Sequence, residues 1–347
     1  MNFQSLHIDH GSFLLNVRKA RNEKLILKTE EIKFKHDCDH VFNPAFVNNI
    51  ALYRCYVGEQ SINDGIYHVH KLQFNEIENN NQAFIFAKKE NYQMVNMAYE
   101  QPIPAIEKRR GSAVGWSWIG AEDGRFFIHK DIIYIAFTAP SAREQIDNMR
   151  GMFIAKLKDA MSNKYIAKEV DNQIGYTRKS EKHWAFIGDA ENNNINVIYQ
   201  LEPFTLGFLD DSLKLLPVAV QTYSCLESSG HTTLNIATNI VKIHQKKDVL
   251  VLIYHVKGAT YNPHVLLLDA EFPYAPIMTS RDPLEIKADH QDFVYVTSLS
   301  TERGTLEANR DDVLVMGIGL SDRGAAYTKL SVKELFALDY IMCNGDD

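Results

Sequence analysis

Two acidic side chains and one basic side chain stand within four residues, in the segment Glu122-Asp123-Gly124-Arg125. The acidity of a carboxyl group beside a fixed cation is set by that neighbour, and a guanidinium can bind a carboxylate or a phosphate through two hydrogen bonds. The glycine lets a ligand approach the backbone closely. The segment therefore predicts proton transfer or anion binding, although Asp-Gly is also a common turn and Glu/Arg pairs are often surface groups.

The residues that follow read as a β-hairpin. RFFIH (125–129) and IIYIAFTA (132–139) are rich in β-branched and aromatic residues and are joined by a polar Lys-Asp pair. Helical periodicity is weak and predicts only short helices at 141–149 and 331–339. Strand-like runs bounded by turn residues recur at 50–58, 66–74, 82–88, 126–139, 152–157, 183–188, 196–201, 248–256, 264–270, 292–300 and 312–320.

Many short strands with little helix are typical of a sandwich, a barrel or a propeller. A hydrophobic-Tyr pattern recurs as ALYR, IIYIAF, NVIYQL and LVLIYHV, at intervals of about 50 to 80 residues that suit one four-stranded blade. We therefore expect an all-β chain, a five-bladed β-propeller with a few short helices. We expect a single domain over 1–347, with blades from about residue 40 to 335 and functional side chains that meet at the central axis.

The bulk composition excludes several function classes. A net charge of −7 argues against binding nucleic acid or coating an anionic membrane. No apolar run approaches the ~20 residues of a membrane span, and the first residues lack the features of a signal peptide. The four cysteines have neither metal-site nor disulfide-framework spacing, so we expect buried or idle thiols, no metal and a cytoplasmic protein. The oligomeric state stays open, a homo-oligomer included.

The segment EDGRFF and the hairpin that ends in IYIAFTA resemble a signature of the five-bladed β-propeller glycosidases and glycoside phosphorylases. Within that group the sequence is most similar to the β-mannoside phosphorylases and the related mannosyltransferase/phosphorylases. Other stretches fit the same frame in the same order: FNPAFV…LYR (42–54), EKHWAFIG…NVIYQLEPFTLGFLD (181–210), LVLIYHVKGATYNPHVLLLD (250–269), FPYAPIMTSRDPL (272–284) and LVMGIGLSDRGAAYTKL (314–330).

The resemblance implies that Asp123 is the single general acid/base of an inverting glycosyl transfer. It implies a sugar or oligosaccharide as partner, inorganic phosphate or a sugar phosphate as co-substrate, and no other cofactor. His255 matches a phosphate-binding histidine of the family, and Tyr261 matches a tyrosine close to that anion. The substrate-binding residues expected on this basis are Arg54, Glu122, Arg125, Lys182, His231, His255, Tyr261 and Asp322.

The chain departs from the family pattern in places. SSGHTTL (228–234) stands where the family has Arg-Gly-Gly-Thr-Pro, so an arginine is absent and His231 lies nearby. KHW replaces Lys-Asn-Trp at 182–184, and Gly124 replaces a common proline. We therefore keep three alternatives open: a glycoside phosphorylase or glycosyltransferase, a glycoside hydrolase of the same fold, and a non-catalytic propeller that binds glycan.

Overall fold

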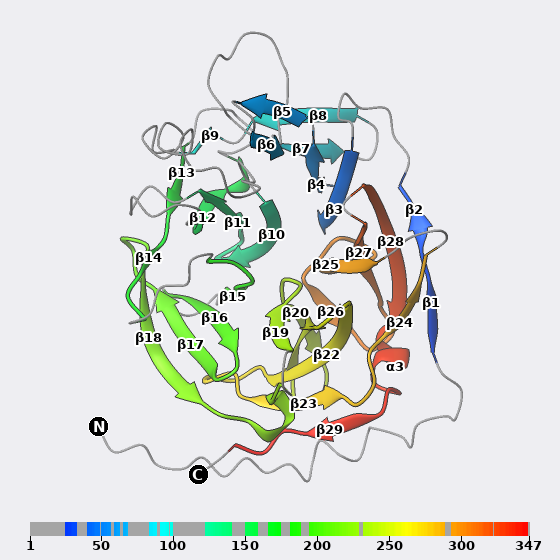
Figure 1. Ribbon diagram of the computed structural model, residues 1–347. Helices are drawn as coiled ribbons and strands as arrows, with labels where there is room; N and C mark the ends of the chain where they lie inside the picture. Colours follow the sequence, from blue (N-terminus) through cyan, green and yellow to red (C-terminus); the bar gives the residue numbers. More distant parts are fainter. Residues whose placement is uncertain are drawn as a thin grey trace.

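Strands dominate the computed structural model of the chain. Five sheets stand around a central axis (Figure 1), which confirms the predicted all-β propeller as the fold class. The division into one domain stays a prediction. The structure describes residues 25–32, 40–48, 50–56, 59–62, 65–68, 83–88, 91–96, 98–99, 122–140, 150–158, 166–174, 181–188, 194–228, 232–288, 293–321 and 323–345.

Each of the first three blades is built on four antiparallel strands that follow one another in chain order, although β5 (Glu59–Ile62) and β6 (Gly65–His68) intervene within the first. The first contains, in hydrogen-bonded order, β3 (His40–Val47), β4 (Ile50–Tyr56), β7 (Ala83–Lys88) and β8 (Asn91–Asn96). The second contains β10 (Glu122–His129), β11 (Ile132–Pro140), β12 (Arg150–Lys156) and β13 (Ile166–Glu169), with β9 (Ala98–Tyr99) added in parallel. The third contains β15 (Ala185–Ile187), β16 (Ile195–Leu201), β17 (Phe204–Leu209) and β18 (Lys214–Gln221), with β14 (Asp171–Asn172) in parallel.

The two ends of the described chain complete the last two blades. In the fourth blade, β19 (Thr233–Ile236) and β20 (Val241–His244) both pair with β21 (Val249–Lys257), which continues to β22 (Tyr261–Asp269), β23 (Pro276–Ser280) and β29 (Tyr340–Met342). The fifth consists of β25 (Val294–Thr301), β27 (Val313–Leu320), β28 (Gly324–Ser331) and β2 (Glu30–Glu31). Smaller pairings join β20 to β26 (Glu307–Asn309), β1 (Ile26–Lys28) to β24 (Glu285–Lys287), and β5 (Glu59–Ile62) to β6 (Gly65–His68).

The predicted hairpin is present as β10 and β11. His129 pairs with Ile132, and the two linking residues, Lys130 and Asp131, have φ angles of 49° and 61°. Two successive residues with positive φ are typical of a type I′ turn, whose twist matches that of the strands it joins. The hairpin therefore forms where the sequence predicts it.

Both faces of the blades are buried between neighbours. Because successive side chains of a strand point to opposite faces, Phe126 lies in an apolar cluster with Leu52 of the first blade, whereas Phe127 lies in a cluster with Trp184 beside the third. Clusters of this kind also fill the spaces between later blades. Two-sided burial explains why the strands read as nearly continuous apolar runs with only partial alternation.

The fifth blade contacts the first through backbone as well as side chains. The carbonyl oxygen of Pro44 accepts hydrogen bonds from the hydroxyl groups of Thr297 (2.6 Å) and Ser298 (2.8 Å). Gly317 faces the same oxygen so closely that a Cβ there would lie 2.2 Å from it. The backbones of β3 and β27 therefore approach each other at a distance that only glycine permits.

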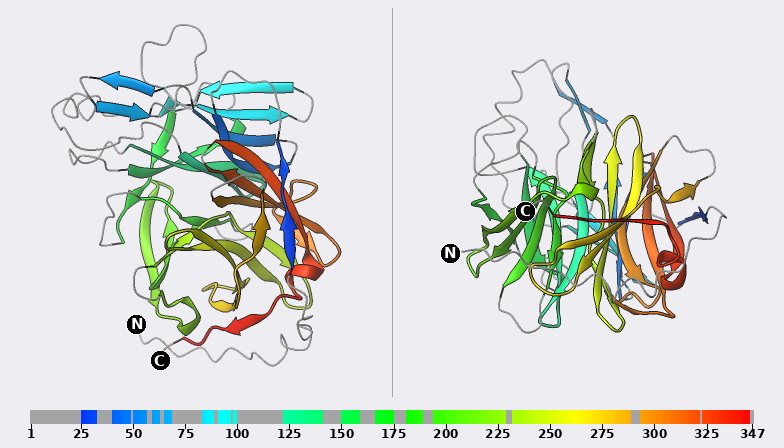
Figure 2. Two further views of the ribbon diagram at one scale, coloured as in Figure 1. Left: turned by 45° about the vertical axis from the view of Figure 1, so that its right-hand side comes forward. Right: turned by 90° about the horizontal axis from the view of Figure 1, so that it is seen from below.

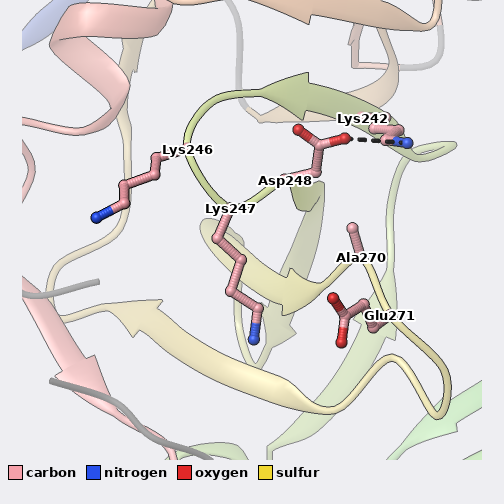
Figure 3. Close-up of a pocket in the computed structure, with 6 residues that line it drawn as sticks. All are labelled: Lys242, Lys246, Lys247, Asp248, Ala270 and Glu271. Atoms are coloured by element: carbon pink, nitrogen blue, oxygen red, sulfur yellow. Dashed lines mark ion pairs between the residues drawn. The ribbon is translucent and has the colours of Figure 1, made fainter. Parts of the chain in front are cut away.

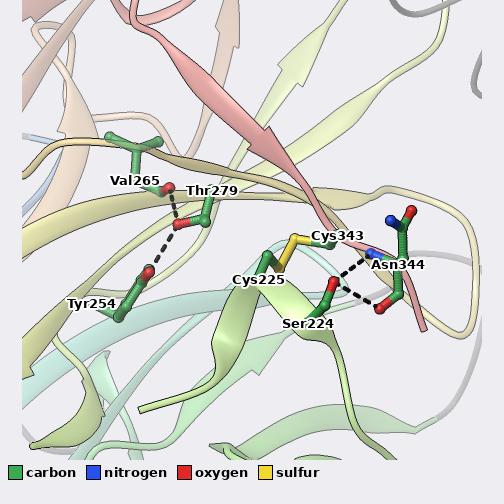
Figure 4. Close-up of a disulfide and its surroundings, with 7 residues drawn as sticks. All are labelled: Ser224, Cys225, Tyr254, Val265, Thr279, Cys343 and Asn344. Carbon is green, nitrogen blue, oxygen red and sulfur yellow. Dashed lines mark hydrogen bonds between the residues drawn. A yellow bond between two sulfur atoms is a disulfide. The ribbon is translucent and has the colours of Figure 1, made fainter. Parts of the chain in front are cut away.

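A disulfide joins Cys225 to Cys343 across 118 positions of sequence (Figure 4). Cys225 lies in the 3-10 turn η3 (Ser224–Leu226), and Cys343 follows β29, which lies along the rim of the fourth blade (Figure 2). The Ser224 N–H also donates to the Asn344 carbonyl (3.0 Å). The expectation of idle thiols is therefore wrong for these two cysteines. Disulfides persist mainly in oxidising compartments, so this bond counts against the cytoplasmic location, which stays a prediction.

Helices are short, as expected. The segment 331–339 contains α3 (Val332–Leu335), which begins after a capping box formed by Ser331 and Glu334. The other expected helix, 141–149, lies outside the described residues. In the part of the chain that the structure describes, no helix is long and apolar enough to cross a membrane.

Candidate active site

Three consecutive blades each place a residue with left-handed backbone within the inner strand or directly before it. Asn43 in β3 and Asp123 in β10 both have a φ of 52°, and His183, just before β15, has a φ of 67°. The pairing register shifts at the first two positions, which marks β-bulges. A bulge re-aims a side chain, and Asn, Asp and His are the non-glycine residues that best tolerate this conformation.

Asp123 accepts contacts from the first blade. The Asn43 side-chain amide donates to its Oδ1 at 3.1 Å, and a guanidinium nitrogen of Arg54 lies 3.8 Å from the same atom. The Asp123 side chain is 13% exposed. Burial alone would raise its pKa, but the nearby charges of Arg54 and Lys182 outweigh that effect and lower the pKa to about 2. Asp123 is therefore a carboxylate at neutral pH.

Glu122 holds the arginine that reaches Asp123. Its Oε1 lies 3.0 Å from one nitrogen of Arg54 and 3.3 Å from a nitrogen of Arg150, and all three side chains are buried. The Arg54 guanidinium also lies over the ring of Phe42, with 4.9 Å between its carbon and the ring centroid. Glu122 therefore acts on Asp123 through the position of Arg54.

Arg125 links three blades. Its guanidinium donates to the carbonyl oxygens of Trp184 (2.9 Å) and Ile236 (2.7 Å), next to and within the inner strands of the third and fourth blades. The side chain is buried, and burial lowers its pKa. Because the ordinary pKa of arginine lies far above neutral pH, the guanidinium stays charged. The structure thus gives Arg125 an anchoring role, while its charge still helps to lower the Asp123 pKa.

His255 is fully buried. Its Nε2 accepts the N–H of Val296 at 3.2 Å, so the proton of the neutral ring belongs on Nδ1. Burial, with the charge of Arg125, lowers its pKa to about 3. A neutral imidazole lacks the positive charge that the implied phosphate-binding role would use, and the ring instead packs 4.5 Å from that of Tyr295.

The remaining expected residues divide into two groups. Lys182 and Tyr261 are partly exposed near the axis; Lys182 lowers the Asp123 pKa, and the Tyr261 ring packs edge-on against Tyr295 at 5.0 Å. His231 and Asp322 lie outside the described residues. The substrate-binding roles of all these residues stay predictions.

Four site residues were missed by sequence reasoning: Asn43, Arg150, His183 and Tyr295. Asn43 and His183 stand inside motifs that the sequence made visible, FNPAFV and KHW, but neither was assigned a role. Nothing local marked Arg150 or Tyr295, because their positions in the site depend on strand pairing. The Tyr295 hydroxyl lies 3.4 Å from Nδ1 of His183 and so connects the fifth blade to the third.

A pocket of about 380 Å³ lies at the far end of the fourth blade (Figure 3). It is formed by the turns that follow β20 and β22, whereas His255 stands at the opposite end of β21. Its lysines are largely neutralised: Lys242 pairs with Asp248 (3.1 Å) and Lys247 with Asp269 (2.7 Å). We assign it no chemistry. Among the described residues, no group of three His, Cys, Asp or Glu side chains is placed to hold a metal ion.

A scan against protein-family models and a search of curated proteins both find no match. Solved structures do match. A β-1,2-mannobiose phosphorylase from Listeria innocua, in complex with β-1,2-mannobiose, is 14% identical with a TM-score of 0.58, over 88% of this chain and 95% of that one. A glycosyl hydrolase from Bacteroides ovatus is 10% identical with a TM-score of 0.52, over 84% of each chain. At these identities the likeness shows the fold alone, and in the fold it confirms the resemblance expected from the sequence to propeller glycosidases and glycoside phosphorylases.

Proposed function

We propose that this protein is a carbohydrate-active enzyme that transfers a glycosyl unit, of mannosyl type, with inversion, as a glycoside phosphorylase or glycosyltransferase. The observation that carries the proposal is the Asp123 carboxylate at the propeller axis, only 13% exposed and held by Asn43 and Arg54. The charge of Lys182 also acts on Asp123 and lowers its pKa, and Lys182 has no hydrogen-bond partner among the described residues. The similar solved structures include a phosphorylase that binds a β-1,2-mannoside, which supports the choice of sugar.

Asp123 moves the proton in this proposal. In phosphorolysis it protonates the glycosidic oxygen as the bond to the anomeric carbon breaks, and a phosphate oxygen bonds to that carbon from the opposite face. The phosphate loses its own proton in forming the sugar phosphate, and that proton restores Asp123 to its acid form. In the synthetic direction the Asp123 carboxylate accepts the proton of the attacking hydroxyl group.

The electrostatics favour phosphate as the co-substrate. With a pKa of about 2, Asp123 holds no proton at neutral pH in the geometry described. A phosphate beside Arg54 and Lys182 would oppose the charges that lower this pKa and would bring Asp123 closer to its acid form. Anion binding and general acid catalysis then depend on each other.

Hydrolysis by the same fold is the second candidate function. An inverting hydrolase needs a base that activates water, usually a second carboxylate. Glu122 is the nearest in sequence, but it is paired with Arg54 and Arg150. A glycan-binding propeller without catalysis is the third reading, and the experiment below separates the three.

The test incubates the protein with mannose 1-phosphate and a panel of acceptor sugars and measures phosphate release. Asp123→Asn keeps the size of the side chain and tolerates the positive φ, so we expect a folded protein with a 10²- to 10⁴-fold loss of turnover. Its Tm should fall somewhat, because the stabilising charge beside Arg54 is lost. Asp248→Asn, at the far end of the fourth blade, is the matched control and should retain full activity. Full turnover by Asp123→Asn would remove Asp123 from the mechanism. Release of sugar from β-1,2-mannobiose in the absence of phosphate would indicate a hydrolase. Sugar binding without turnover would indicate a glycan-binding module.

A further inference from the structure

His183 occupies the third position in the series of left-handed residues at the axis. Like Asn43 and Asp123 it has a positive φ and lies within or just before an inner strand, and the Asn43 side chain is hydrogen-bonded to Asp123. His183 and Asp123 each affect the pKa of the other, so each side chain lies within the electrostatic range of the other. Histidine is one of the few residues other than glycine that this backbone conformation tolerates, so the position can present an imidazole.

The two ring nitrogens of His183 have different surroundings. Nδ1 lies 3.4 Å from the hydroxyl group of Tyr295, whereas Nε2 has no hydrogen-bond partner in the part of the chain that the structure describes. The residue is partly exposed. Burial and the neighbouring charges of Lys182 and Arg125 keep the pKa of the ring well below its ordinary value. The neutral ring offers one hydrogen-bond donor and one acceptor.

We propose that His183 is a substrate-contacting residue: its Nε2 forms a hydrogen bond with one hydroxyl group of the sugar whose glycosidic oxygen lies at Asp123, and Tyr295 holds the ring in position. This inference rests on the proposed function. A sugar hydroxyl can donate and accept, so it suits either tautomer of the imidazole. A site that hydrogen-bonds a hydroxyl discriminates against an analogue that lacks it, because its own polar group is then left unpaired.

The test uses His183→Asn, because asparagine also tolerates positive φ and the backbone of the bulge is then preserved. We expect kcat/KM with mannose 1-phosphate to fall about tenfold, as for the loss of one hydrogen bond, with Tm unchanged. Tyr295→Phe, which keeps the ring and removes the hydroxyl, should give a smaller loss in the same direction. His244→Asn is the matched control. His244 ends β20 in the fourth blade, beside the pocket at the far end of that blade, and pairs with Asp248 and Glu307.

Monodeoxy analogues of mannose 1-phosphate separate contact from mere structural support. With the wild-type protein, kcat/KM for one analogue should be about tenfold lower than for mannose 1-phosphate. With His183→Asn the same two substrates should give equal kcat/KM, because the imidazole that binds this hydroxyl is already absent. An equal penalty for every analogue in both proteins, or a kcat/KM of His183→Asn within twofold of wild type, would overturn the proposal. If the wild-type protein neither binds nor turns over any sugar of the panel, the proposed function fails and this inference fails with it. If Asp123→Asn is inactive while His183→Asn keeps a kcat/KM within twofold of wild type, this inference alone fails.

Discussion

Replacing Arg54 by methionine should raise the pKa of Asp123 and destabilise the protein. Arg54 contributes the largest of the charges that lower this pKa, and it also pairs with the buried Glu122 at 3.0 Å. Methionine keeps an unbranched apolar stem that can still pack on Phe42, so the change removes the charge with little loss of volume. The variant therefore tests the electrostatic account of the site.

The magnitude follows from the geometry. Unit charges 3.8 Å apart, as between Arg54 and Asp123, interact by about 4 kcal/mol at an effective dielectric constant of about 20, or about 3 pKa units. Because Asp123 is partly exposed, solvent screening reduces this, and we expect a rise of about 1 to 2 units from about 2. Glu122 keeps Arg150 at 3.3 Å, so the free energy of unfolding should fall by about 3 kcal/mol, the low end for a broken buried pair.

The assay titrates Asp123 by carboxyl carbon NMR, with Asp123→Asn to assign its signal, and measures unfolding in urea at the same pH values. In the wild type the folded pKa lies below the unfolded value of about 3.9, so the stabilisation from Asp123 is present above pH 4 and is lost as pH falls toward 2. In Arg54→Met this loss should shift to higher pH or vanish. Arg281→Met removes an exposed pair with Asp339 and should change stability by less than about 1 kcal/mol. If Asp123 titrated at the same pH in both proteins, the assigned cause of its low pKa would be wrong.

Two further predictions concern stability. The disulfide closes a loop of 118 positions, for which chain entropy gives a stabilisation of at most about 5 kcal/mol. Replacing Cys225 and Cys343 together by serine should therefore lower the urea midpoint substantially, and a reductant acting on the wild type should do the same. A reductant that left the midpoint unchanged would argue against the bond. Lys130 and Asp131 in the type I′ turn have φ values of 49° and 61°, which asparagine and glycine adopt more readily. Changing Lys130 to Asn and Asp131 to Gly should therefore stabilise the protein by about 1 kcal/mol. A lower Tm would show that contacts of the native side chains contribute more stability than the relieved backbone strain.

The fold was predictable because its signals are local and repeated. The hairpin at 126–139 combines β-branched and aromatic runs with a polar two-residue turn, and the structure pairs His129 with Ile132 as that pattern requires. The disulfide was not predictable, because Cys225 and Cys343 meet only after β29 has paired with β23, a strand more than sixty positions earlier. Cysteine spacing along the chain carries no trace of that pairing.

The site was predictable only in part, for the same reason. Asp123 stood out because its acidic and basic neighbours are adjacent in sequence, but the partners that set its acidity come from other strands. Glu122 on β10 meets Arg150 on β12, and these strands are not direct neighbours in the sheet. Such a contact depends on side chains that reach across β11, and no sequence pattern specifies it. Arg125 was visible, but its carbonyl partners on two other blades were not.

Asn43, Asp123 and His183 show why a structural repeat need not be visible as a sequence repeat. Asn43, Asp123 and His183 share a backbone conformation and a place at the axis, but they share neither charge nor size. What recurs is a break in strand alternation, which several residue types allow, while the chemistry at each break differs. A propeller can in this way keep one scaffold and bring an amide, a carboxylate and an imidazole to a single point. Because each of these side chains belongs to a different blade, exchanging one of them should alter the chemistry at the axis while leaving the packing between blades intact.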